Sequence, residues 1–181
     1  GPAFGTPPHA PPVTLAATGN PPASTLGFSL NPVPSVPNTS TLTIGTTGVS
    51  TSSSTFALTG TTSGGGTQSM GSVELNVFSA APASAPTLTA PANGATGQPT
   101  GPTFTWSAVA GTASYVLEVD DDSAFGSINF TTTVAGTTAN GSGLSSLTTY
   151  YWRVRPTNPC GSGSNSAVFS FTTGACISPN L

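Results

Sequence analysis

Apolar and polar side chains alternate along several short stretches of this chain. In "SYVLEVD", Tyr115, Leu117 and Val119 fall on one side, and "TYYWRVR" alternates in the same way. Successive side chains of a β-strand point to opposite faces of a sheet, so each stretch predicts a strand with one buried face. Clusters of Gly, Pro, Asn and Ser interrupt the alternation about every ten residues, and helical periodicity is missing. The pattern predicts an all-β protein built from two tandem antiparallel β-sandwiches.

The alternating stretches fall into two modules separated by "SAAPASAP". In the first module we expect strands at 13–18, 25–30, 39–47, 55–61 and 72–78. The stretches "NPVPSVPN", "TGVSTSSS" and "TSGGGTQ" are predicted as turns. The expected organisation is a Pro-rich extended leader at 1–12, a partial sandwich at 13–79, a linker at 80–85, a second sandwich at 86–174 and a C-terminal tail at 175–181.

Charged residues make up only 4% of the sequence, and Lys is absent. The complete charged set is Glu74, Glu118, Asp120, Asp121, Asp122, Arg153 and Arg155. A net charge of −3 with two Arg argues against nucleic acid or an anionic membrane surface as a partner. No run of about 18 apolar residues is present, so we expect no membrane insertion. A surface rich in Ser and Thr hydroxyls suits an extracellular or cell-surface protein.

The sequence offers little for catalysis. A Ser or Thr nucleophile needs a nearby base, and the only His is His9, inside the Pro-rich leader. The absence of Lys removes Schiff-base chemistry, and the zinc-protease motif H-E-x-x-H is missing. We therefore expect neither an enzyme nor a bound cofactor.

The second module carries a family resemblance over nearly all of 86–174. The stretches "APTLTAPANGA", "FTWSAVAGTASYVLEV" and "GLSSLTTYYWRVRPTNPCGSGSNSAVFSFTT" resemble bacterial fibronectin type III modules. Leu144, Thr148 and Tyr150 match the family's Leu-x-x-x-Thr-x-Tyr pattern, which implies that Tyr150 is the tyrosine corner. Trp106 matches the core tryptophan of the family's second strand.

The first module resembles the later part of a bacterial immunoglobulin-like repeat over roughly 13–78. The stretches that carry this resemblance are "FSLNPVPSVPNTSTLTIGTT", "FALTGTTSGG" and "VELNV". In that family, two further strands usually precede the stretch that corresponds to the start of this chain. The tail "CISPNL" is similar to the opening of the P domain that follows such modules in secreted bacterial proteases. The resemblance implies an internal segment of a larger secreted protein.

The acidic stretch "EVDDDS" is the best candidate for a ligand site. Glu118, Asp120 and Asp122 lie at period two and could offer carboxylate oxygens to Ca²⁺. The competing interpretation is structural. In the fibronectin type III topology the third and sixth strands are neighbours, which would place Glu118 and Asp120 opposite Arg153 and Arg155.

Three sequons are possible glycosylation sites, at Asn38, Asn129 and Asn140. Such short matches also arise by chance in a Thr-rich chain. Trp106, Tyr150 and Trp152 are expected in the core, whereas Tyr151 is expected to face outward beside the Arg pair.

The two cysteines, Cys160 and Cys176, are expected at opposite ends of the fibronectin-like sandwich. The strand at 167–173 between them would span about 23 Å at about 3.3 Å per residue. A disulfide needs Cα atoms within about 7 Å, which argues against an intrachain bridge unless the tail folds back. Two possibilities remain open: an intermolecular disulfide in a head-to-tail stack, or pairing of Cys176 inside a following domain.

The partial first sandwich suggests how copies could associate. A sandwich that lacks strands leaves an exposed edge, and a neighbouring chain can fill it by β-strand addition. We therefore expect a non-enzymatic extracellular structural protein, a self-assembling subunit of a fibre, stalk or adhesive appendage. The alternative is an accessory segment that spaces or anchors a secreted bacterial protease. A third possibility is a carbohydrate- or Ca²⁺-binding module.

Overall fold

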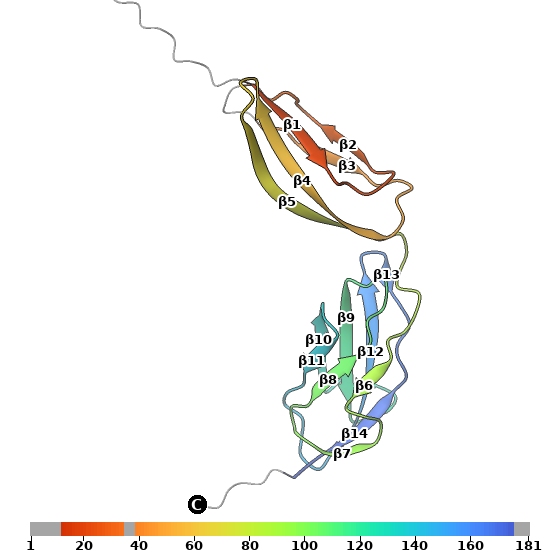
Figure 1. Ribbon diagram of the computed structural model, residues 1–181. Helices are drawn as coiled ribbons and strands as arrows, with labels where there is room; N and C mark the ends of the chain where they lie inside the picture. Colours follow the sequence, from red (N-terminus) through yellow and green to blue (C-terminus); the bar gives the residue numbers. More distant parts are fainter. Residues whose placement is uncertain (1–11, 35–38, 176–181) are drawn as a thin grey trace, which may run out of the picture. The chain divides into compact units, whose positions relative to one another are not determined.

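The computed structural model of the chain describes residues 12–34 and 39–175, and every strand in Figure 1 lies in these ranges. All regular secondary structure in the described residues is β-strand, which confirms the predicted fold class. The chain divides into two compact units, Gly1–Ser79 (unit 1) and Ala80–Leu181 (unit 2). In the described part of the chain no helix is long and apolar enough to cross a membrane.

Unit 1 contains two antiparallel sheets of unequal width. The wider sheet has the order β1–β4–β5, with β1 at Val13–Thr18, β4 at Ser52–Thr62 and β5 at Thr67–Val77. The narrower sheet pairs β2, Thr25–Phe28, with β3, Leu42–Gly45. Two strands therefore face three.

The strand boundaries in unit 1 differ from the prediction where pairing outweighs local propensity. The stretch "TGVSTSSS" was expected to form a turn, but Ser52 already belongs to β4. Ser52 pairs with Val77 of β5, which is buried, so β4 begins at Ser52 and continues the ladder to the end of β5. At the other end β5 begins at Thr67, earlier than the predicted residue 72, because Thr67 pairs with Thr61.

The core of unit 1 is small. Phe56 on β4 is 1% exposed, and Val49 and Val77 are also buried. A Cβ atom at Gly60 would lie 2.8 Å from Val13 Cγ1, so the absence of a side chain there lets β1 and β4 pack closely. The apolar residues that face this core from β1, β2 and β3 are only half-buried: Leu15, Leu26, Phe28, Leu42 and Ile44.

Unit 2 contains a six-stranded sheet and a three-stranded sheet (Figure 1). The larger sheet has the order β10–β9–β12–β14–β7 with β13 beside β12, and the smaller sheet has the order β11–β8–β6. All pairs are antiparallel except β14 with β7. The strands are β6 Leu88–Ala90, β7 Ala95–Gln98, β8 Thr103–Trp106, β9 Ser114–Asp120, β10 Phe130–Val134, β11 Thr138–Asn140, β12 Thr149–Asn158, β13 Gly161–Ser162 and β14 Phe169–Thr173.

Aromatic rings from both sheets fill the core of unit 2. Phe104 on β8 lies 5.0 Å from Trp152 on β12 and 5.7 Å from Phe171 on β14, measured between ring centroids. Trp106, 4% exposed, packs against Tyr115 at 5.7 Å. Edge-on and tilted contacts of this kind add to the free energy gained by burial alone. The predicted core faces are confirmed.

Tyr150 forms the corner that the sequence predicted. Its hydroxyl accepts a hydrogen bond from the backbone N–H of Ser145 at 2.9 Å. Leu144, next to this turn, is buried. This corner and the strand order identify unit 2 as a β-sandwich of the fibronectin type III kind.

Candidate functional site

The two edge strands of the wider sheet in unit 1, β1 and β5, differ in how their outward backbone groups are hydrogen-bonded. On β1, Val13 exchanges two backbone hydrogen bonds with Val33, each 2.8 Å. The side-chain amide of Asn31 then continues this edge: its Oδ1 accepts from Leu15 N at 2.8 Å, and its Nδ2 donates to Leu15 O at 2.9 Å. Asn31 therefore acts as a short substitute for a neighbouring strand.

The opposite edge, β5, pairs with β4 on one side and has no second strand among the described residues. Residues 67–74 of β5 are all exposed. Exposed edges in monomeric proteins are usually protected by Lys, Pro or a bulge. The β5 sequence "TQSMGSVELNV" has neither Lys nor Pro. Its protection is limited to a single charge, Glu74, and a bulge.

That bulge lies at Met70 and Gly71. The register shifts between Ala57 and Thr59 on β4, so one extra residue of β5 faces Leu58. Gly71 has φ of 91°, a conformation that other residues adopt only with strain. Because of the extra residue, Met70 and Val73 share the inner face although they are three residues apart.

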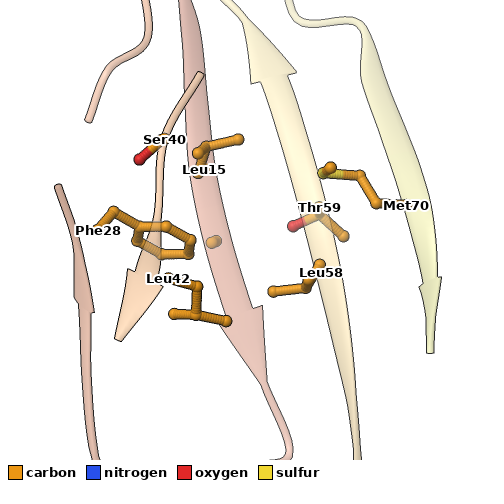
Figure 2. Close-up of a pocket in the computed structure, with 8 residues that line it drawn as sticks. Leu15, Phe28, Ser40, Leu42, Leu58, Thr59 and Met70 are labelled. Atoms are coloured by element: carbon orange, nitrogen blue, oxygen red, sulfur yellow. The ribbon is translucent and has the colours of Figure 1, made fainter. Parts of the chain in front are cut away.

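The inner face near β5 is poorly covered. Met70 is 66% exposed and Val73 is 42% exposed, although both are apolar. Figure 2 shows a groove beside Met70, with Phe28 and Leu42 on one side and Leu58 and Met70 on the other. Its volume is about 70 Å³, and each of the five strands contributes an apolar residue: Leu15, Phe28, Leu42, Leu58 and Met70. The narrower sheet is too small to close it.

Glu74 is the only charged residue between positions 1 and 79. Its Oε1 accepts hydrogen bonds from Ser53 Oγ and from Asn76 Nδ2, both at 3.2 Å. These donors belong to the outer face of the sheet, away from the groove. The β5 edge thus presents an almost uncharged strand beside an apolar groove.

In unit 2, the acidic stretch is organised around an ion pair. Arg153 Nε donates to Glu118 Oε2 at 2.7 Å across the β9–β12 pair, which confirms the expected partnership of these two residues. The guanidinium of Arg153 also lies 4.0 Å from the ring centroid of Phe125, in the β9–β10 loop. Nothing in the sequence pattern predicts this second contact.

The other half of the expected charge pairing is wrong. Asp120 lies opposite Tyr151, and Arg155 lies opposite Val116, because the strand register brings only Glu118 and Arg153 together. Asp120 is fully buried, and its Oδ2 accepts from Ser127 N at 3.2 Å, so the loop folds back over it.

Asp122 turns into the β9–β10 loop instead of joining the other acidic residues. Its Oδ1 accepts from Ala124 N at 3.0 Å. Among the residues that the structure describes, no three His, Cys, Asp or Glu side chains are grouped to hold a metal ion. The candidate Ca²⁺ ligands Glu118, Asp120 and Asp122 therefore have separate structural partners.

Cys160 is exposed, in the turn between β12 and β13. Asn158, two residues earlier, donates from Nδ2 to Ala80 O at 2.8 Å. This loop thus lies beside the point at which the chain enters unit 2, as expected. Cys176 lies outside the described residues, and an intermolecular disulfide of the two cysteines stays a prediction.

The sequons differ in their surroundings. Asn129 and Asn140 are exposed; Asn129 Oδ1 accepts from Asp121 N at 2.7 Å, and Asn140 Oδ1 accepts from Thr103 Oγ1 at 2.9 Å. Asn38, like His9, lies outside the described residues. Glycosylation of these positions stays a prediction.

Three solved structures illustrate what the chain is similar to. The sixth fibronectin type III domain of human fibronectin type III domain containing protein 3 shares 24% identity, with 58% of this chain and 97% of that chain covered and a TM-score of 0.41. A Fn3-like protein from Clostridium thermocellum shares 22% identity, with coverage of 55% and 100% and a TM-score of 0.41. The chicken CNTN1 FN1-FN3 domains share 17% identity, with coverage of 93% and 59% and a TM-score of 0.43. No protein-family model and no curated protein sequence matches the chain.

Proposed function

We propose that this chain is a non-enzymatic structural segment of an extracellular protein, and that it assembles with copies of itself into a fibre, stalk or adhesive appendage. The observation that carries this proposal is the open β5 edge of unit 1 beside an incompletely covered apolar face. Unit 2 serves as a folded spacer whose own core is complete.

The energetics of unit 1 favour a partner. An exposed edge offers unpaired N–H and C=O groups, and an added strand would satisfy them while covering Val73, which is 42% exposed. Burial of apolar area contributes about 25 cal/mol per Å², which offsets part of the entropy lost on association.

The hydrogen bonding of the opposite edge, β1, also supports β5 as the assembly surface. Val33 and Asn31 satisfy the outward backbone groups of Val13 and Leu15 within the chain, so β1 has less to offer a partner than β5. A monomer designed to stay single would be expected to protect both edges.

The proposal is tested by measuring the size of the full chain over a wide concentration range. Sedimentation velocity in the presence of reductant should show mass increasing with concentration, and negative-stain microscopy of concentrated protein should show polymers. A Val73→Lys variant places a charge on the exposed inner face and should shift the protein towards monomer. Thr133→Lys, on an exposed position of unit 2, is the matched control and should associate like the wild type. A monomer at every concentration would contradict the proposal and favour a spacer role in a secreted protease.

A further inference from the structure

The β5 strand contains a segment that is complementary to itself. We propose that residues 73–77 of one copy pair antiparallel with the same residues of a second copy, about a twofold axis at Leu75. This inference rests on the proposed self-assembly and specifies its surface and register.

The complementarity follows from the sequence "VELNV", which is nearly palindromic. With Leu75 opposite Leu75 of the partner subunit, Val73 lies opposite Val77 of the partner subunit. Directly opposed residues of an antiparallel pair share a face. Val73 pairs with Phe56 in its own sheet, and Phe56 is 1% exposed, so these apolar residues continue the inner face. The apolar face of each copy would therefore extend across the joint.

Charge favours the register centred on Leu75 over the register centred on Glu74. With the axis at Leu75, Glu74 lies opposite Asn76 of the partner subunit, which is a neutral hydrogen-bonding group. A register centred on Glu74 would instead place two carboxylates directly opposite each other, and like charges in that position are destabilising. Apolar pairing and charge therefore agree on the same alignment.

Charge also indicates what kind of partner fits. Unit 1 has no positive charge and a single negative one, Glu74, so it offers little with which to select a charged peptide or surface. Its edge can recognise a neutral extended strand through backbone hydrogen bonds and an apolar face. A second β5, with the same length and the same lack of Lys and Pro, meets this description.

The bulge limits how far the pairing extends. Met70 and Gly71 interrupt the alternation, and bulges increase local twist, so the joint is confined to the segment after them. A joint of this length is small by the standards of stable protein interfaces, so the association is weak and reversible. An isologous joint closes as a dimer, and a fibre needs a second contact elsewhere on the chain.

Exposed outer-face positions allow a test that leaves the fold intact. Asn76→Lys would place a cation opposite Glu74 of the partner subunit, twice per dimer. Asn76→Glu would place a like charge there. From cross-strand pair energies, dimer affinity of the full chain should rise roughly two- to thirtyfold for the first variant and fall by a similar factor for the second. The double variant Glu74→Lys, Asn76→Glu should restore association.

Ser72→Lys and Ser72→Glu are the matched controls. They make the same changes in net charge on the same strand, outside the paired segment, and should leave affinity almost unchanged. Affinity is measured by sedimentation equilibrium with reductant present. If the Ser72 variants respond and the Asn76 variants do not, the proposed register is wrong. If the protein associates but neither pair of variants changes affinity, β5 pairing is wrong while self-assembly stands. If no association occurs, both proposals fail.

Discussion

Arg153 is held between a carboxylate and an aromatic ring: its Nε lies 2.7 Å from Glu118 Oε2, and its guanidinium lies 4.0 Å from the Phe125 ring centroid. These contacts join β12 to β9 and to the loop that follows β9. Both members of the ion pair are partly buried, with side-chain exposures of 26% and 19%. The loop after β9 is therefore fastened to the outer face of the larger sheet.

Removal of this contact should destabilise unit 2 moderately. Arg153→Ala loses an ion pair and a cation–π contact, which together contribute roughly 1–2 kcal/mol. Phe125→Leu should cost about 0.5–1 kcal/mol, because it removes only the ring. Urea unfolding followed by Trp fluorescence measures both, since Trp106 and Trp152 both belong to unit 2. Equal stability of the Arg153 variant and the wild type would show that the contact is unimportant.

Loss of the Tyr150 hydroxyl should destabilise unit 2 more than loss of the Tyr151 hydroxyl. Tyr150→Phe leaves the N–H of Ser145 without its partner, at an expected cost of about 1–3 kcal/mol. Tyr151→Phe is the matched control, because Tyr151 faces the other side of the sheet. The measurement is again urea unfolding by Trp fluorescence. Similar losses in both variants would contradict the assigned role of the Tyr150 hydroxyl.

The protected β1 edge predicts a local change in hydrogen exchange. Asn31→Ala removes the acceptor of Leu15 N, so the Leu15 amide should exchange faster with solvent. Asn31→Asp keeps the acceptor oxygen and should preserve more of the protection. Amide exchange followed by NMR measures this effect, with Trp fluorescence of unit 2 as an unchanged reference. An unchanged rate at Leu15 in the Ala variant would mean that Asn31 does not protect the edge.

The two cores should respond separately to deletion of a buried ring. Phe56→Ala should cost unit 1 about 3–5 kcal/mol, and Phe104→Ala should do the same to unit 2. The Trp unfolding transition should shift only in the second variant, because unit 1 has no Trp. A clear shift in the Phe56 variant would show that the units unfold as one.

Alternation of side chains was enough to predict the strands that carry the cores. Tyr115, Leu117 and Val119 are all buried on β9, and Tyr150 occupies its predicted corner. These features depend on local pattern and on a family motif, both of which are visible in one sequence.

The features of the candidate site depend on pairing between distant residues. The bulge at Met70 and Gly71 follows from the register with β4, and the protection of β1 follows from the approach of Asn31 to Leu15. The expected position of Asp120 opposite an Arg failed for the same reason, since strand identity does not set the register. An open edge was expected in unit 1, but its location on β5 required the strand order.

Amide hydrogen exchange of β5 as a function of protein concentration tests the assembly surface most directly. If copies pair through this edge, amides within 73–77 should exchange more slowly as concentration rises, while amides of β10, an edge strand of unit 2, should not change. If the protein associates and the β5 amides exchange at the same rate at every concentration, this edge is not the assembly surface.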